Sequence, residues 1–323
     1  MPRSLTISPL GFWHVHADDY ARQVREHPHT TLGPVWDDDP ERGAEAAARL
    51  GVDFEPSLER LLARPDIDGV TVTTRTDDHT RVIGAAIAAG KHVFTEKLLA
   101  PTVAESEQLV AAAHDAGVAL TVSLPQLTAP ATRAAERLVA DGALGELTYV
   151  RVRMAHDGWL GGWLPERFAD PVAAVGGALS DLGCHPLYLV QLLLGARPER
   201  VVASYGSFTG RPVEDNAVVV LGYPRGAIGV AEASFVTSPG AFAFEVRGTE
   251  GSLLYGFGGE RLIGKGARLN ADAWAELPLP EAGPGPFAQW VDHALAGTQP
   301  QDNQRAAVEL TRLVVAANAA ARG

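Results

Sequence analysis

Short apolar runs alternate with amphipathic stretches through the first part of the chain. Apolar runs of this length predict buried strands, and the stretches between them show the spacing of helices that cover a parallel sheet. The predicted strands are Leu5–Leu10, Thr31–Trp36, Gly69–Thr74, His92–Thr95 and Ala119–Ser123, and the predicted helices include Ala17–Glu26, Pro40–Leu50, His79–Ala89 and Val103–Ala116. Two of these helices begin with capping signals, Asp39 before Pro40 and Thr102 before Glu105.

The pattern changes near residue 146, where Val150, Val152 and Met154 alternate with two arginines. This period of two predicts strands with one polar face. Further predicted strands are Arg200–Tyr205, Asn216–Tyr223, Ala227–Phe235, Ala243–Arg247 and Ser252–Tyr255, with one long helix at Ala178–Leu194. Short links favour a large, mostly antiparallel open sheet with helices on one face. We therefore expect an α/β domain over residues 1–123 and an α+β domain over residues 124–323, whose C-terminal helix can pack back on the first domain.

Length and charge agree with this division and exclude some partners. A chain of 323 residues exceeds the usual size of one core. The 27 basic residues against 39 acidic ones argue against nucleic acid or an anionic membrane as the main partner. No apolar run has the length of a membrane span, and the N-terminus lacks a signal pattern. A single cysteine, Cys184, agrees with the reducing cytoplasm.

Lysine is scarce: Lys91, Lys97 and Lys265 are the only three, and the other basic residues are arginines. Lysine can be tuned by burial and can exchange protons, whereas arginine stays charged. Lys97 follows Glu96 at the carboxyl end of the fourth predicted strand, where ligands of doubly wound sheets bind. There it can polarise a carbonyl group or relay a proton. The alternative is a surface Glu–Lys pair. Lys91 is interpreted as a charge at a helix end.

A second candidate segment contains Asp181 and His185, followed by Pro186. In a helix, residues four apart share a face, so the carboxylate can orient the imidazole as a general base. The alternative is an aspartate that only satisfies a buried histidine. A metal site would need a third ligand, and we expect none.

Together these segments resemble the glucose–fructose oxidoreductase / inositol dehydrogenase / rhizopine catabolism (Gfo/Idh/MocA) family. The resemblance covers essentially the whole chain and includes Ala89–Val93 before the Glu–Lys pair and Val213–Asn216 in the second domain. It implies a Rossmann-type domain that binds a nicotinamide cofactor and a sheet domain that often forms the interface of a homodimer or homotetramer. It also implies that Lys97 is the catalytic lysine, His185 the general base, and Asp181 the residue that holds substrate and tunes His185.

Two positions depart from the family pattern. Leu98 replaces the proline that usually follows the Glu–Lys pair. Tyr188 stands where the family often has an aspartate, and its hydroxyl can contact substrate.

The phosphate loop departs further. Where G-x-G-x-x-G is expected, the sequence reads Gly11-Phe12-Trp13-His14-Val15-His16, so only Gly11 remains. This resembles a short-loop branch of the family. Trp13 would crowd a pyrophosphate in the usual pose, but helix N-terminal amides from His14 onward can still bind phosphate. The two histidines are alternatively a metal site, or stacked or capping side chains.

The cofactor prediction rests on the end of the second strand. Asp37 is placed to accept the ribose hydroxyls of NAD, and two further carboxylates with no adjacent arginine disfavour NADP. Thr74, Arg75 and His79 occupy the place of the family's Thr-Pro-Asn and histidine, and Arg75 can reach a phosphate or a substrate oxyanion.

Trp159, Trp163 and Arg167 lie on a glycine-rich loop before the histidine segment. Aromatic faces and polar groups suit a sugar ring, although tryptophans on loops are also often subunit contacts. The sequence thus predicts an NAD-dependent oxidoreductase of a secondary alcohol or ketone on a sugar, inositol or glycoside. The alternatives are a non-catalytic NAD- or sugar-binding regulator, and a redox-neutral enzyme with tightly bound NAD.

Overall fold

The computed structural model describes residues 4–195 and 197–321. The chain divides into two compact units. The first runs to Leu124 and includes Pro284–Thr311, and the second comprises Pro125–Gly283 with the residues from Arg312 onward. Each unit is described by itself.

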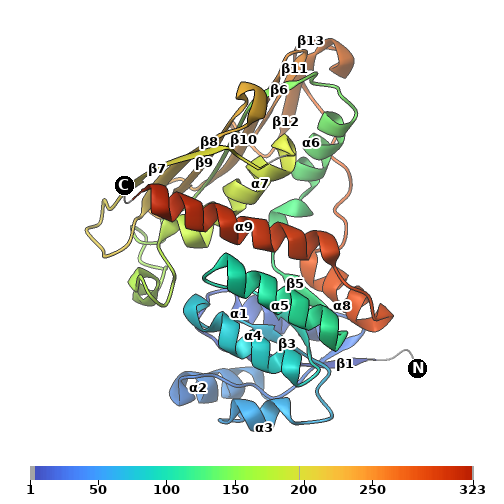
Figure 1. The fold of residues 1–323 in the computed structure, drawn as a ribbon, viewed down its shortest axis with the longest axis vertical. Helices are drawn as coiled ribbons and strands as arrows, with labels where there is room; N and C mark the ends of the chain where they lie inside the picture. The colour runs from blue at the N-terminus through green and yellow to red at the C-terminus, as the bar shows by residue number, and fades with distance from the viewer. Residues whose placement is uncertain (1–3, 196, 322–323) are drawn as a thin grey trace. The chain divides into compact units, whose positions relative to one another are not determined.

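The first unit contains a parallel sheet in the order β2-β1-β3-β4-β5 (Figure 1). Its strands are β1 (Leu5–Leu10), β2 (Thr30–Leu32), β3 (Gly69–Val72), β4 (His92–Thr95) and β5 (Leu120–Val122). The strand order reverses between β1 and β3, and such a switch point is where doubly wound sheets bind ligands. The parallel sheet expected from the apolar runs is confirmed.

The second strand is shorter than predicted. Val35 and Trp36 form only isolated bridges, to Phe54 and Leu10. Gly33 and Pro34 interrupt the strand because proline has no N–H to donate to a sheet.

The helices of this unit follow the predicted pattern closely. They are α1 (Ala17–Glu26), α2 (Pro40–Leu50), α3 (Leu58–Leu62), α4 (His79–Ala88), α5 (Val103–Ala116), α8 (Pro286–Ala296) and the first part of α9 (Gln301–Ala320). Both predicted caps form, because the carboxylate of Asp39 accepts the N–H groups of Glu41 and Arg42, and Thr102 accepts that of Glu105. Phe287 and Trp290 of α8 pack with Leu5 and Phe94 in one buried cluster.

The second unit is built on an eight-stranded sheet in the order β13-β12-β11-β10-β6-β9-β8-β7. Its strands are β6 (Leu147–Ala155), β7 (Arg200–Gly206), β8 (Asn216–Gly222), β9 (Ile228–Ser234), β10 (Ala241–Gly248), β11 (Gly251–Tyr255), β12 (Leu262–Gly266) and β13 (Ala271–Glu276). All neighbours are antiparallel except β6 and β9. Helix α7 (Cys184–Leu194) packs against β6 and β9, and α6 (Pro130–Ala140) packs against α7 (Figure 1). The mostly antiparallel sheet is confirmed, whereas β12 and β13 were not predicted.

The predicted continuous helix Ala178–Leu194 is wrong in its first part. Leu179–Gly183 form a π-helical turn, and the α-helix begins only at Cys184. Pro186 has no N–H for the carbonyl of Leu182, which removes one α-helical hydrogen bond at this point. Asp181 and His185 are therefore not an ordinary i,i+4 pair on an α-helix.

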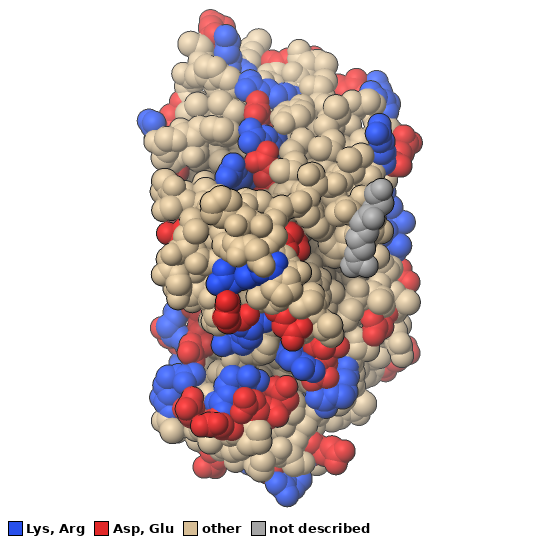
Figure 2. All heavy atoms as spheres, turned by 90° about the vertical axis from the view of Figure 1, so that its left-hand side faces the viewer, with Lys and Arg blue, Asp and Glu red and all other residues tan. Residues whose placement is uncertain are grey.

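On the face drawn in Figure 2, acidic and basic side chains are intermixed rather than collected in a basic area. Among the described residues, no helix has both the length and the apolar character that a bilayer crossing requires.

Candidate functional site

The Glu96–Lys97 pair at the end of β4 is buried. The two residues are 1% and 5% exposed. The ammonium Nζ of Lys97 lies 3.2 Å from Oε2 of Glu96, and the Lys97 backbone N–H donates to the same oxygen. The Lys97–Leu98 peptide bond is cis. The alternative of a surface ion pair is therefore excluded.

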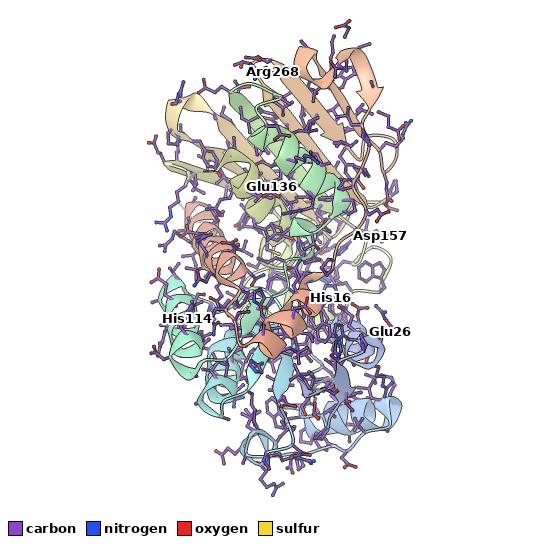
Figure 3. The ribbon with its side chains drawn as sticks, turned by 90° about the vertical axis from the view of Figure 1, so that its right-hand side faces the viewer. His16, Glu26, His114, Glu136, Asp157 and Arg268 are labelled. Atoms are coloured by element: carbon purple, nitrogen blue, oxygen red, sulfur yellow. The ribbon has the colours of Figure 1, made fainter. Side chains whose placement is uncertain are left out.

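The other oxygen of Glu96 is held by side chains from the beginning of α1. Nδ1 of His16, labelled in Figure 3, lies 2.9 Å from Oε1, and the hydroxyl of Tyr20 donates to the same oxygen. Burial alone would raise the pKa of Glu96, but the charges of Lys97, His14 and His16 hold that pKa well below its ordinary value. Burial and the nearby Glu96 raise the pKa of Tyr20 well above its ordinary value. Glu96 is thus an anion beside a neutral phenol.

Tyr20 was missed by the sequence analysis. The available signal was its position four residues after His16, which places both side chains on one face of the helix. Nothing in the sequence pairs that face with Glu96, more than 70 residues further along the chain.

The loop after β1 is tightly packed. Gly11 has a φ of +86°, and a Cβ there would lie 2.6 Å from Cγ2 of Thr74, so only glycine fits. Phe12 belongs to the core cluster between α1 and α2, and Trp13 is 4% exposed. The backbone N–H of His14 donates to the carbonyl oxygen of Thr73 at 3.0 Å. Of the amides from His14 onward that were expected to bind phosphate, that of His14 is therefore already bonded within the protein.

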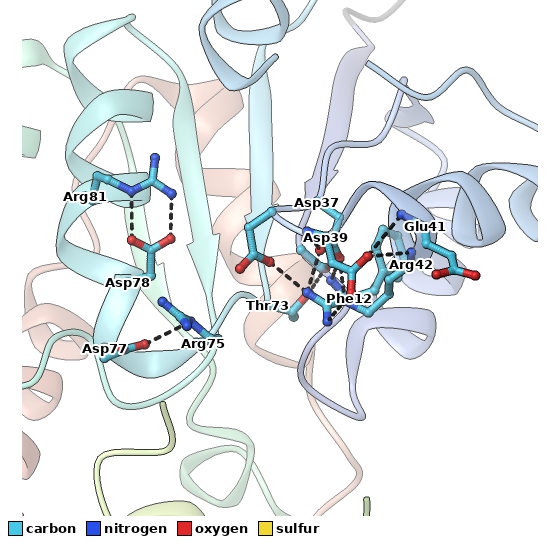
Figure 4. Close-up of polar contacts among 12 residues, drawn as sticks. Phe12, Asp37, Asp39, Glu41, Arg42, Thr73, Arg75, Asp77, Asp78 and Arg81 are labelled. Carbon is cyan, nitrogen blue, oxygen red and sulfur yellow. Dashed lines mark hydrogen bonds and ion pairs between the residues drawn. The ribbon is translucent and has the colours of Figure 1, made fainter. Parts of the chain in front are cut away.

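Asp37 is buried and already has several donors, drawn in Figure 4. Its carboxylate accepts the backbone N–H groups of Phe12 at 2.6 Å and Asp39 at 2.8 Å. The guanidinium of Arg42 binds both carboxylate oxygens, at 2.9 and 2.5 Å. Arg42 also pairs with Asp38. The expectation of no adjacent arginine is therefore wrong, since one helical turn of α2 brings Arg42 back to Asp37.

The three candidates after β3 differ in accessibility. The hydroxyl of Thr74 is buried and has no hydrogen-bond partner among the described residues. Arg75 has a partly exposed side chain whose Nε lies 3.3 Å from Asp77 (Figure 4). His79 is fully buried, and its Nδ1–H donates to the carbonyl oxygen of Leu98 at 2.6 Å. Burial lowers the pKa of His79. His79 thus holds the segment that follows Lys97.

In the second unit, His185 is buried and bonded to Tyr188. Nδ1 of His185 lies 2.8 Å from the Tyr188 hydroxyl oxygen, which also accepts the backbone N–H of Gln126 at 3.1 Å. The Tyr188 hydroxyl, which was expected to contact substrate, thus lies within hydrogen-bond distance of His185. Asp181 lies in the preceding π-helical turn and is partly exposed.

The tryptophans of the loop after β6 are not equivalent. Trp159 is 7% exposed and packs against Phe235, with the guanidinium of Arg211 over its ring. Trp163 is 52% exposed, and its Nε1–H donates to Asp157 at 3.1 Å. Arg167 is partly exposed in a 3₁₀ turn, Glu166–Ala169. Of the two rings, only Trp163 offers an open face.

Two family models cover most of the chain. Residues 10–124 match an oxidoreductase family with an NAD-binding Rossmann fold, and residues 132–254 match the GFO/IDH/MocA C-terminal domain. The chain belongs to the Gfo/Idh/MocA family. It is accordingly a nicotinamide-dependent oxidoreductase of the dehydrogenase class.

Relatives of this Gfo/Idh/MocA protein support the assignment. It is 35% identical to a 1,5-anhydro-D-fructose reductase of Ensifer adhaerens over 75% of this chain and 73% of that protein. The crystal structure of an oxidoreductase domain protein from Kribbella flavida is 28% identical, with a TM-score of 0.85 over 99% and 97% of the two chains. An inositol dehydrogenase homologue from Azotobacter vinelandii, complexed with NAD⁺, is 26% identical, with a TM-score of 0.83 over 99% and 96%.

The switch point of this Gfo/Idh/MocA chain fits a dinucleotide. Gly11 after β1 brings two backbones together where a Cβ would clash, and the buried hydroxyl of Thr74 after β3 is unpartnered among the described residues. Dinucleotides bind doubly wound sheets at such a switch point.

Proposed function

We propose that this protein transfers a hydride between NAD and a secondary alcohol or ketone on the ring of a sugar, inositol or glycoside. The observation that carries the proposal is Lys97, a buried lysine paired with a carboxylate at the carboxyl end of β4. An ammonium group in such a place can stabilise the oxygen on which negative charge develops. The names of the relatives, an anhydrofructose reductase and an inositol dehydrogenase homologue bound to NAD⁺, support this substrate class.

Each candidate residue has a defined task in this proposal. NAD, when bound, supplies the hydride acceptor. Lys97 steadies the substrate oxygen, and Glu96 keeps the lysine charged and in place. His185 takes the hydroxyl proton on Nε2 in the tautomer whose Nδ1–H donates to Tyr188, since Nε2 then carries the lone pair. Asp181 tunes His185.

Cofactor contacts are proposed for the loop Gly11–His14, for Asp37, and for Thr74, Arg75, His79 and Glu96. NAD is preferred over NADP because three consecutive carboxylates repel a ribose phosphate. Arg42 weakens this repulsion, since it neutralises Asp37 in part. We expect Arg42→Ala to widen the preference for NAD over NADP, measured as the ratio of their dissociation constants.

Trp163, Arg167 and the hydroxyl of Tyr188 are proposed to contact the substrate ring, and Trp159, which packs on Phe235, is proposed to hold the loop in place. A homodimer or homotetramer is proposed to form through the open sheet. Neighbouring strands of this sheet carry exposed apolar side chains that a second subunit can cover, namely Val202, Val218, Val220 and Ile228. The cytoplasm is the proposed location.

The test is NAD reduction with a panel of cyclic polyols and sugars. We expect Lys97→Met and His185→Ala to lower kcat/KM by about 1,000-fold on any substrate found. The matched control is Lys265→Met, which removes an exposed lysine of β12. Near-normal turnover in either active-site variant would overturn the assignment. Turnover of substrate with no net NADH would indicate the redox-neutral alternative instead.

A further inference from the structure

We propose that His14, His16 and Glu96 form a binding site for a divalent transition-metal ion, with Zn²⁺ the best match. One donor atom from each side chain lies within 4.8 Å of the others. Two imidazoles and one carboxylate are a known ligand set for four-coordinate zinc with one open position. Calcium and magnesium prefer oxygen ligands and fit this set less well.

Two segments that lie far apart in the sequence converge on the site. His14 and His16 lie on the turn before α1 with their ring centres 4.6 Å apart, and Glu96 follows β4. His14 and Glu96 are buried, whereas the side chain of His16 is 48% exposed and gives an ion access from solvent. Tetrahedral zinc needs donors about 3.3 Å apart. His16 Nδ1 and Glu96 Oε1 are already 2.9 Å apart.

The two oxygens of Glu96 have separate partners, so a metal ion can bind without breaking the Lys97 pair. Lys97 contacts Oε2, whereas His16 and Tyr20 contact Oε1. A metal ion between His16 Nδ1 and Oε1 would take the place of the proton in this hydrogen bond; that proton is released to solvent, and the ligating neutral imidazole carries its remaining proton on Nε2. Tyr20 then remains a hydrogen-bond donor to the ligating carboxylate, as outer-shell partners of metal sites commonly are.

The positively charged ammonium group of Lys97 lies beside Glu96 and would repel a metal ion bound there. We therefore expect the ion to bind more tightly when Lys97 is replaced by an uncharged residue. If the three side chains had only a structural role, replacing Lys97 would not tighten the binding of a metal ion.

The chain contains its own control in a second His-x-His pair, His27 and His29, at the other end of α1. The backbone N–H of His29 lies 3.3 Å from Nδ1 of His27, the same local contact that His16 makes with His14. Among the described residues, no carboxylate completes a metal group with this pair. Comparing the two pairs therefore distinguishes metal binding that requires Glu96 from metal binding by two nearby histidines alone.

The experiment uses the full chain, freed of metal with a chelator and titrated with Co²⁺ and then Zn²⁺. We expect one Co²⁺ per chain with the visible absorption of a four-coordinate ion, displaced by Zn²⁺. His16→Ala and Glu96→Gln should each weaken binding by about 100-fold. His29→Ala should bind as the wild type does, and Lys97→Met should bind about 10-fold more tightly.

His16 is half-exposed, so His16→Ala is expected to fold, and its thermal unfolding provides the check. Absence of stoichiometric Co²⁺ binding in the wild type would overturn the proposal. Equal weakening by His16→Ala and His29→Ala would also overturn it, because the ion would then bind His-x-His pairs without Glu96. This readout does not depend on hydride transfer, so its failure is distinct from failure of the proposed function.

Discussion

Asp37 and Glu96 are two buried carboxylates at the edge of the first sheet where ligands are expected, and their partners are of different kinds. The donors to Asp37 come from two short segments and are the backbone N–H groups of Phe12 and Asp39 and the side chain of Arg42. Glu96 takes partners that can themselves ionise, Lys97 beside it and His16 and Tyr20 from α1. An arginine cannot exchange protons, whereas a lysine, a histidine and a tyrosine can. We therefore expect Asp37 to position the chain and Glu96 to control reactive groups.

The comparison is tested most strongly by removing each negative charge without changing size. We expect Glu96→Gln to lower kcat by about 100-fold, because Lys97 loses its counter-ion, and to raise the dissociation constant of NAD only a few-fold, because Glu96 is one of several proposed cofactor contacts. Asp37→Asn should instead raise the KM for NAD and leave kcat within a few-fold. Steady-state kinetics on the two variants measure this split. The reverse pattern, with kcat lost only in Asp37→Asn, would break the comparison.

If Asp37 holds the chain in position, replacing its partner Arg42 should lower the stability of the protein. Arg42→Ala leaves a buried carboxylate with only backbone donors, and we expect the free energy of unfolding to fall by about 2 kcal/mol, less than for a fully buried pair because Arg42 is partly exposed. The matched control is Arg60→Ala, which breaks the exposed pair with Glu55 and should cost at most about 0.5 kcal/mol. Urea unfolding compares them, and equal losses would contradict the account.

A smaller loss of stability is expected when the hydrogen bond from Tyr20 to Glu96 is removed. Tyr20→Phe removes one hydrogen bond to a buried anion, which is worth about 1.5 kcal/mol. The phenyl ring keeps the edge contact with Phe94, so packing is preserved. Urea unfolding of the variant measures the difference. A change near zero would show that Glu96 does not depend on this donor.

The smallest effect is the pH dependence due to His79. Burial lowers its pKa, so below about pH 6.5 the unfolded chain binds a proton that the folded chain resists. Stability should therefore fall as the pH drops below this value, with a slope of at most about 1.4 kcal/mol per pH unit from this group. His79→Gln should reduce the slope. An unchanged slope in urea unfolding from pH 7 to 5 would show that other groups dominate.

Elements with strong local signals were predicted closely. The bounds of α1, α2, α5 and β4 agree with the sequence expectation because caps, apolar spacing and glycine stops all act within a few residues. β12 was missed because its alternation is broken by Gly264 and Gly266. β13 was missed because five of its six residues are exposed, which leaves no apolar face to detect.

The site was predictable only in part for the same reason. The Glu96–Lys97 pair and the His185 segment are local motifs, so sequence reasoning found them. The ion pair of Arg42 with Asp37 spans one helical turn and was overlooked. The contacts of His16 and Tyr20 with Glu96 depend on where α1 packs against β4, which no local pattern specifies.

The most direct test of the central claim is a single-turnover measurement of NADH formation in Lys97→Met. The enzyme is first saturated with NAD, and a polyol that the wild type oxidises is then added. The account predicts that the variant binds NAD with wild-type affinity and forms NADH about 1,000-fold more slowly. NADH formation at the wild-type rate would contradict it.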